Sequence, residues 1–139
     1  MITVGIWADE RKFINEVIKA IGYDPNIKID NSCFTPQVLV LQHNKGNICA
    51  QANILIMLDD DLPDNVYAKI AVSCGINEKN TITLSSAEDD CVMVSLQREI
   101  LSVKGTVLEP REIDLSGING TTEEKMLIGA LKLVLEKDS

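Results

Sequence analysis

The stretch Ile2-Thr3-Val4-Gly5-Ile6-Trp7, together with the amphipathic segment that follows it up to Gly22, decides the fold class. The first six residues are apolar and rich in β-branched side chains, which is typical of a buried strand. Asp9 is a good helix N-cap, and apolar side chains then recur at helical spacing at Ile14, Val17, Ile18 and Ile21. The pattern predicts a β-strand followed by an α-helix that ends at Gly22.

Three further apolar runs are continuous rather than alternating, which is typical of strands covered on both faces of a parallel sheet. They are Val38–Leu41, Ile54–Leu58 and Ile70–Val72. The connections between them are short for a parallel sheet, in which neighbouring strands need a crossover of about a dozen residues. Segment 44–52 is barely long enough for one.

The second half of the chain changes character. Short runs at residues 81–84, 91–96, 100–103 and 112–115 are separated by turn residues such as Lys104-Gly105-Thr106, and their spacing predicts antiparallel hairpins. A last helix opens with the capping box Thr121-x-x-Glu124 and should pack on the sheet. We therefore expect a single α/β domain over residues 1–139, with a small P-loop- or Rossmann-like parallel sheet and helices, and with antiparallel strands in the second half.

The charge composition limits the classes of partner that the protein can bind. Thirteen basic and twenty-one acidic residues give a net charge of −8, which opposes binding to nucleic acid and to anionic membranes. The N-terminus lacks the apolar core of a signal peptide. We expect a cytoplasmic protein whose partner is another protein or a second copy. Cys74 and Cys91 lie in apolar runs and are interpreted as small buried side chains.

The loop after the first strand is a candidate phosphate site, because phosphates bind at helix N-termini in α/β proteins. A working P-loop needs several glycines, a lysine and a Ser or Thr. Here the candidate residues are Gly5, Asp9 and Glu10, and the two carboxylates would oppose a phosphate while stabilising the helix themselves. A structural helix cap is the competing interpretation.

The segment from Ile2-Thr3-Val4-Gly5 to Ile21-Gly22-Tyr23 resembles the first strand, P-loop and helix of the central ATPase domain of the Mur ligases and folylpolyglutamate synthases. Residues 37–42 resemble the family's strand that ends in a magnesium-binding glutamate, and residues 52–61 the strand that enters its T-N-x-x-x-D-H motif. Leu115-Ser116-Gly117-Ile118-Asn119 is similar to its L-x-G-x-H-N motif.

Each functional position departs from this family's pattern. Asp9 or Glu10 stands at the lysine, Gln42 replaces the magnesium glutamate, and Ile118-Asn119 replaces the H-N dipeptide. The histidine after the third strand is also missing. The resemblance therefore implies a shortened, degenerate domain that kept the fold and lost the chemistry.

Two other features carry chemistry. Asp59, Asp60 and Asp61 follow an apolar strand and offer oxygen ligands to a divalent cation, although a solvated turn is the competing interpretation. His43, the one histidine, follows the preceding strand and is the catalytic candidate for proton transfer.

The leading functional hypothesis is a non-catalytic Mur-ligase-like domain that associates with a protein partner or with itself. The alternatives are a divalent-cation-dependent nucleotide-binding protein or enzyme, and a regulatory module that binds a small metabolite without turnover. No cofactor is expected under the leading hypothesis, whereas Mg-ATP belongs to the nucleotide-binding alternative.

Overall fold

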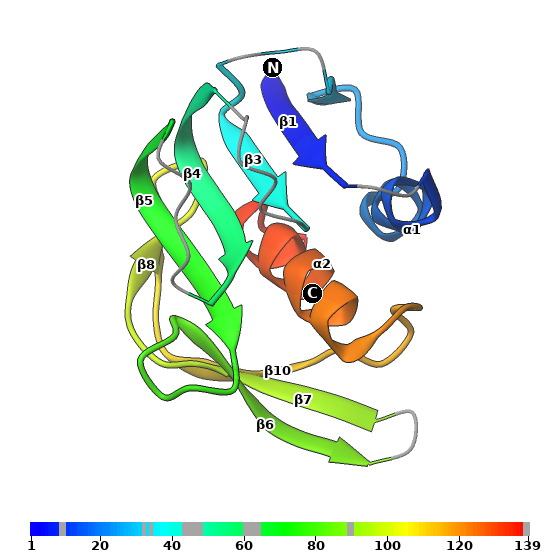
Figure 1. The fold of residues 1–139 in the computed structure, drawn as a ribbon, viewed down its shortest axis with the longest axis vertical. Coiled ribbons are helices and arrows are strands. Elements are labelled where there is room, and N and C mark those ends of the chain that lie inside the picture. Colours follow the sequence, from blue (N-terminus) through cyan, green and yellow to red (C-terminus); the bar gives the residue numbers. More distant parts are fainter. Residues whose placement is uncertain are drawn as a thin grey trace.

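The computed structural model describes residues 1–8, 11–31, 33, 35–42, 49–59, 65–88 and 91–137. Its elements follow in the order β1 (Ile2–Trp7), α1 (Arg11–Ile21), β2 (Ile27–Ile29), β3 (Val38–Leu41), β4 (Ala50–Leu58), β5 (Val66–Gly75), β6 (Ile82–Glu88), β7 (Cys91–Leu96), β8 (Ile100–Leu101), β9 (Val107–Leu108), β10 (Arg111–Asp114) and α2 (Thr122–Val134). Figure 1 shows α2 packed on the sheet and the β6–β7 hairpin projecting from one end.

An eight-stranded mixed sheet organises the molecule, in the order β10-β7-β6-β5-β4-β3-β1-β2. The strands from β2 to β6 are parallel, whereas β7 runs antiparallel to both β6 and β10. The pair β8–β9 forms a separate antiparallel sheet, joined by the predicted turn at 104–106. The α/β class, the parallel first half and the antiparallel second half are confirmed.

The central strands β3, β4 and β5 are stacked in a regular register that places Val38, Ile54 and Ile70 in line across the sheet. Segments 42–49 and 59–65 join them, so parallel neighbours are linked here by less chain than a helical crossover uses. The N–H groups of Asn53 and Ile54 both donate to the Gln37 carbonyl, at 3.2 and 3.0 Å. This shared acceptor marks a β-bulge in the middle of β4.

Both helices pack on the same face of the sheet. Their buried side chains, such as Phe13, Val17, Leu127 and Leu131, share one core cluster with inward residues of the strands. A second, smaller cluster on β3 and β4 contains Leu39, Leu41, Leu55 and Met57. Because successive side chains of a strand point to opposite faces, these two clusters explain why the central runs are apolar throughout.

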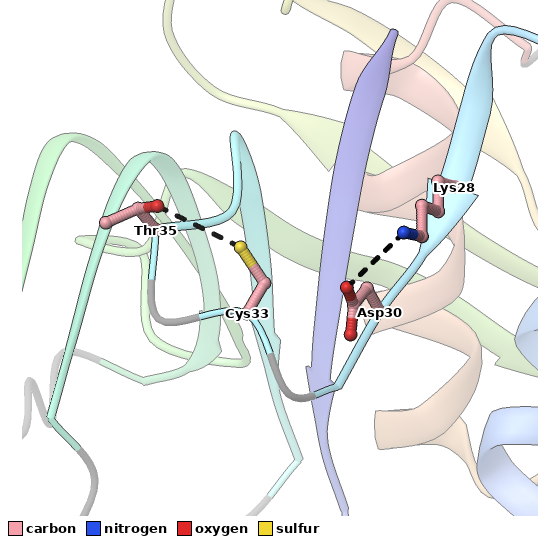
Figure 2. Close-up of polar contacts among 4 residues, drawn as sticks. All are labelled: Lys28, Asp30, Cys33 and Thr35. Carbon is pink, nitrogen blue, oxygen red and sulfur yellow. Dashed lines mark hydrogen bonds and ion pairs between the residues drawn. The ribbon is translucent and has the colours of Figure 1, made fainter.

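The short strand β2 was not predicted, because its residues lie in a stretch that looks polar. Asn31 extends its ladder, since its Oδ1 accepts from the Ile6 N–H at 3.0 Å. Figure 2 shows the polar contacts of this segment, a 3.7 Å ion pair between Lys28 and Asp30 and a 3.9 Å contact between Cys33 Sγ and Thr35 Oγ1. Both are surface contacts of small energetic value.

The terminal helix and its capping box are confirmed. The Thr121 hydroxyl accepts from the Glu124 N–H at 3.2 Å, and Glu124 Oε1 accepts from the Thr121 N–H at 2.9 Å. One prediction about the core is wrong: Cys91 is exposed at the start of β7, whereas Cys74 is buried as expected. In a half-buried antiparallel strand, the side chain of Cys91 lies on the solvent side of the alternation.

Candidate functional site at the carboxyl edge of the sheet

A cavity of about 400 Å³ opens where β4 and β5 end, beside the first turn of α2. Its walls are mainly apolar and are formed by Leu58, Cys74, Ile76, Leu84 and Met126, with Gly75 and Thr122. The carboxylate-bearing residues Asp59 and Glu123 also line it. A pocket of this size, apolar with a few polar groups, is the usual form of a small-molecule site.

The ends of two parallel strands fix the floor of this cavity. Leu58 lies opposite Cys74 in the register, and the Asp59 N–H donates to the Cys74 carbonyl at 2.8 Å. Asp59 then adopts a positive φ of 54°, a conformation in which Asp and Asn are the commonest residues after glycine. This turn ends β4 and holds the Asp59 side chain at the rim.

Gly75, next to the cavity rim, has no room for a larger side chain. A Cβ on Gly75 would lie 2.4 Å from Asn80 Nδ2 and 2.6 Å from Asp59 Oδ1. Asn80 is almost fully buried, and in the part of the chain that the structure describes neither its Nδ2 nor its Oδ1 has a hydrogen-bond partner. The missing Cβ of Gly75 therefore leaves room for both the Asn80 amide and the exposed Asp59 carboxylate beside the cavity.

Cys74 is the one thiol in the cavity wall, and burial raises its pKa to about 12. Its Sγ lies 4.0 Å from the Met126 carbonyl. A thiol with this pKa stays protonated at neutral pH, and the thiolate is the nucleophilic form. Cys74 therefore contributes apolar surface rather than covalent chemistry.

A second candidate location at this edge is the topological switch point between β1 and β3. There the strand order reverses direction, because β2 and β3 lie on opposite sides of β1. Ligands of open α/β sheets usually bind at such a point. Here Gln42 Nε2 donates to Glu124 Oε2 at 2.9 Å, which ties the end of β3 to the capping box of α2. Gln42 Oε1 is buried and has no hydrogen-bond partner among the described residues.

Of the predicted site residues, Asp59 lies at the cavity rim and Gly5 lies inside β1. A Cβ on Gly5 would approach Pro36 Cγ at 3.2 Å and Leu39 Cδ1 at 3.3 Å, so this glycine allows close packing of the segment before β3. Asp9, Glu10, His43, Asp60 and Asp61 lie outside the described residues.

Sequence reasoning missed most of the cavity wall. Leu84 and Met126 belong to segments recognised only as strand and helix, and Ile76 follows β5 as an isolated apolar residue that is 83% exposed. The one local signal in the sequence was a large apolar residue, Ile76, directly after Gly75 at the end of an apolar run. Glu124 was interpreted as a cap residue alone, and Glu123 was not singled out.

Comparisons of the chain with protein-family models, curated proteins and solved structures find no match. The similarity to the Mur ligases therefore stays a prediction that rests on the residues quoted above. Within the described ranges, no group of three or more His, Cys, Asp or Glu side chains is placed to hold a metal ion. In the same part of the chain, no helix is long and apolar enough to cross a membrane.

Proposed function

We propose that this protein is a regulatory module that binds a small molecule in the cavity between β4, β5 and α2 without turning it over. The carrying observation is the cavity itself, an apolar pocket of about 400 Å³ at the carboxyl edge of parallel strands. The protonated state of Cys74 supports binding without covalent catalysis. A degenerate Mur-ligase-like origin belongs to the same proposal, because such a domain keeps the cleft and loses the reaction.

The charges at the cavity select the ligand. Among the described residues, its lining contains the carboxylates of Asp59 and Glu123 and no lysine or arginine. A flat apolar molecule that carries an amine should bind best, because the body fills the apolar wall and the ammonium group meets the carboxylates. A nucleoside triphosphate should bind poorly, since its phosphates would face those same carboxylates.

A matched series of ligands tests this by isothermal titration. Tryptamine, indole and indole-3-acetate share one ring system and differ in charge, so we expect affinity to fall in that order. ATP with and without Mg²⁺ should give no saturable heat. If none of the three indoles binds, the small-molecule proposal is wrong. Saturable Mg²⁺-dependent ATP binding would instead establish the nucleotide-binding alternative.

Asp59→Asn is the matched variant. Asparagine tolerates the positive φ of this position, and Asp59 is exposed, so the fold should be retained. The variant should reduce the preference for tryptamine over indole, while Glu99→Gln, another exposed site that does not line the cavity, should leave it unchanged.

Self-association is the second candidate, and one observation favours it. β5 pairs with β6 only at Cys74 and Gly75, so the side of β5 from Val66 to Val72 has no partner strand among the described residues. An open strand edge is a template for another strand. Tyr67 on this segment is 68% exposed.

The occupant that fits this edge is a second copy of the chain. If two copies pair antiparallel about Ala68, Tyr67 of each copy lies opposite Lys69 of the other, which keeps the two lysines apart and permits a cation–π contact. Tyr67→Lys should then convert a dimer to a monomer, and Tyr67→Lys combined with Lys69→Asp should restore the dimer. Sedimentation equilibrium measures both, and a monomeric native protein rejects this candidate.

A further inference from the structure

A second cavity, of about 260 Å³, lies away from the carboxyl edge, between the two helices and the turn before α2. Glu16, Lys19 and Ala20 of α1 line one side. The turn residues Ser116, Gly117, Ile118 and Asn119 line another side, and Lys132 of α2 completes it. It shares no residue with the cavity at β4 and β5.

Two lysines from different helices face this cavity in a protein with a net charge of −8. With twenty-one acidic residues in the chain, each lysine would be expected to have a carboxylate neighbour. The ion pairs of the described residues nevertheless join Lys28 to Asp30 and Lys137 to Asp24, and neither Lys19 nor Lys132 takes part. Among the described residues the two lysines therefore form no ion pair, and Glu16 is the one carboxylate-bearing residue of the cavity lining.

The turn that forms the floor is held in place by its own hydrogen bonds. The N–H and hydroxyl of Ser116 both donate to Asp114 Oδ1, and the Ile118 N–H donates to the Leu115 carbonyl at 3.3 Å. Gly117 has a positive φ of 85°, which a glycine adopts without strain. This arrangement leaves the Asn119 side-chain amide, an N–H donor, at the exposed rim of the cavity.

Two features of the cavity act against an anion. Lys19 and Lys132 both lie in the last turn of their helices, where a lysine stabilises the negative end of the helix dipole. Glu16 contributes one negative charge, which leaves the lining with a net charge of +1. A singly charged anion would gain little binding energy in this lining. A ligand that binds both lysines must therefore carry at least two negative charges.

We infer that the cavity between α1, α2 and residues 116–119 is a binding site for a small, doubly charged oxyanion, held by Lys19 and Lys132. The volume suits a phosphate group or a short dicarboxylate, and both supply oxygens to two ammonium groups at once. The site is independent of the cavity at the carboxyl edge and so does not rest on the function proposed for that cavity.

The experiment is an NMR titration of the full chain at low ionic strength with inorganic phosphate and, separately, with succinate. We expect saturable shifts of the amide signals of residues 116–119 with one or both anions. A preference for phosphate assigns a phosphorylated ligand and a preference for succinate assigns a carboxylate ligand. Absence of saturable shifts at these residues with both anions overturns the inference.

Charge variants separate binding from helix stabilisation. Lys19→Gln and Lys132→Gln should each weaken anion binding about 1.5- to fivefold, as expected for loss of one exposed charge contact. Glu16→Gln should strengthen it by a similar factor because it removes a like charge. Lys28→Gln, an exposed lysine outside the cavity, is the control. If the two lysine variants lose stability and bind the anion unchanged, the lysines serve the helix ends alone and the inference fails.

Discussion

Replacing Gln42 by glutamate tests the hydrogen bond that joins the end of β3 to the first turn of α2 at the switch point. In the native protein Gln42 Nε2 donates to Glu124 Oε2 at 2.9 Å. Gln42→Glu removes this donor and places a second carboxylate against the first. The same change introduces the residue type that the resemblance to the Mur ligases places at this position.

The magnitude follows from the contact. Loss of a hydrogen bond to a charged group costs about 1.5–3 kcal/mol of unfolding free energy. Repulsion between the two carboxylates adds to this loss of stability. The repulsion cannot cost more than protonating the introduced carboxyl, because the group would otherwise take up a proton. For an ordinary glutamate that protonation costs about 4 kcal/mol at pH 7. Gln42→Glu should therefore lower the free energy of unfolding by about 2–4 kcal/mol at pH 7, and by less at pH 4.5, where the introduced group is partly protonated and can donate.

Urea unfolding followed by circular dichroism measures these differences. The matched controls are Glu124→Gln, in which the glutamine still completes a capping box, and the exchanged pair Gln42→Glu with Glu124→Gln. The exchanged pair again sets an amide donor against a carboxylate, so it should recover most of the lost stability. The reasoning is refuted if Gln42→Glu is as stable as the native protein, or if the exchanged pair is no more stable than Gln42→Glu alone.

Three further outcomes follow from local chemistry. Lys137 donates a hydrogen bond to Asp24 and lowers the pKa of that carboxyl below 3.8. The contact therefore stabilises the protein above pH 3.8, and this stabilisation is lost as the pH falls through the lowered pKa of the folded state. Lys137→Ala should return the pKa of Asp24 toward 3.8, which an NMR titration measures. At pH 7.5 a thiol reagent should modify exposed Cys91 in the native protein, but Cys74, with a pKa of about 12, only after unfolding. Gly75→Ala should cost about 1–3 kcal/mol in urea unfolding, because its Cβ meets polar atoms at 2.4 and 2.6 Å.

The elements that the sequence predicted well are those whose periodicity is complete within a short window. The capping box at Thr121 and the continuous apolar runs of β3 and β4 are local signals, and the structure contains each of them. The strand β2 was missed because Ile27 and Ile29 give too short an alternation to separate from a loop. Its pairing with β1 is a tertiary effect that no window of the sequence contains.

Of the residues around the candidate cavity, sequence reasoning singled out Asp59, as a candidate cation ligand, and missed those that the strand register brings there. Asp59 was recognised because it follows an apolar run directly. The cavity also needs Leu84 and Met126, which are remote in the sequence and meet there because β6 pairs with β5 and α2 crosses their ends. Exposure of Cys91 was missed for a similar reason, since an apolar run does not reveal which of its residues faces solvent.

The positions of the acidic residues explain why a ligand without phosphate would be favoured at the carboxyl edge of the sheet. An anion at a helix N-terminus is stabilised by free N–H groups and by the helix dipole. In α2 those groups are engaged by the chain's own capping box, in which Thr121 and Glu124 exchange hydrogen bonds, and Glu123 adds a further carboxylate to the first turn. Gln42 then fixes Glu124 at the switch point. The chain thus supplies its own anions where a phosphate would lie, and the cavity at this edge, beside β4 and β5, is the one where we propose that an amine binds.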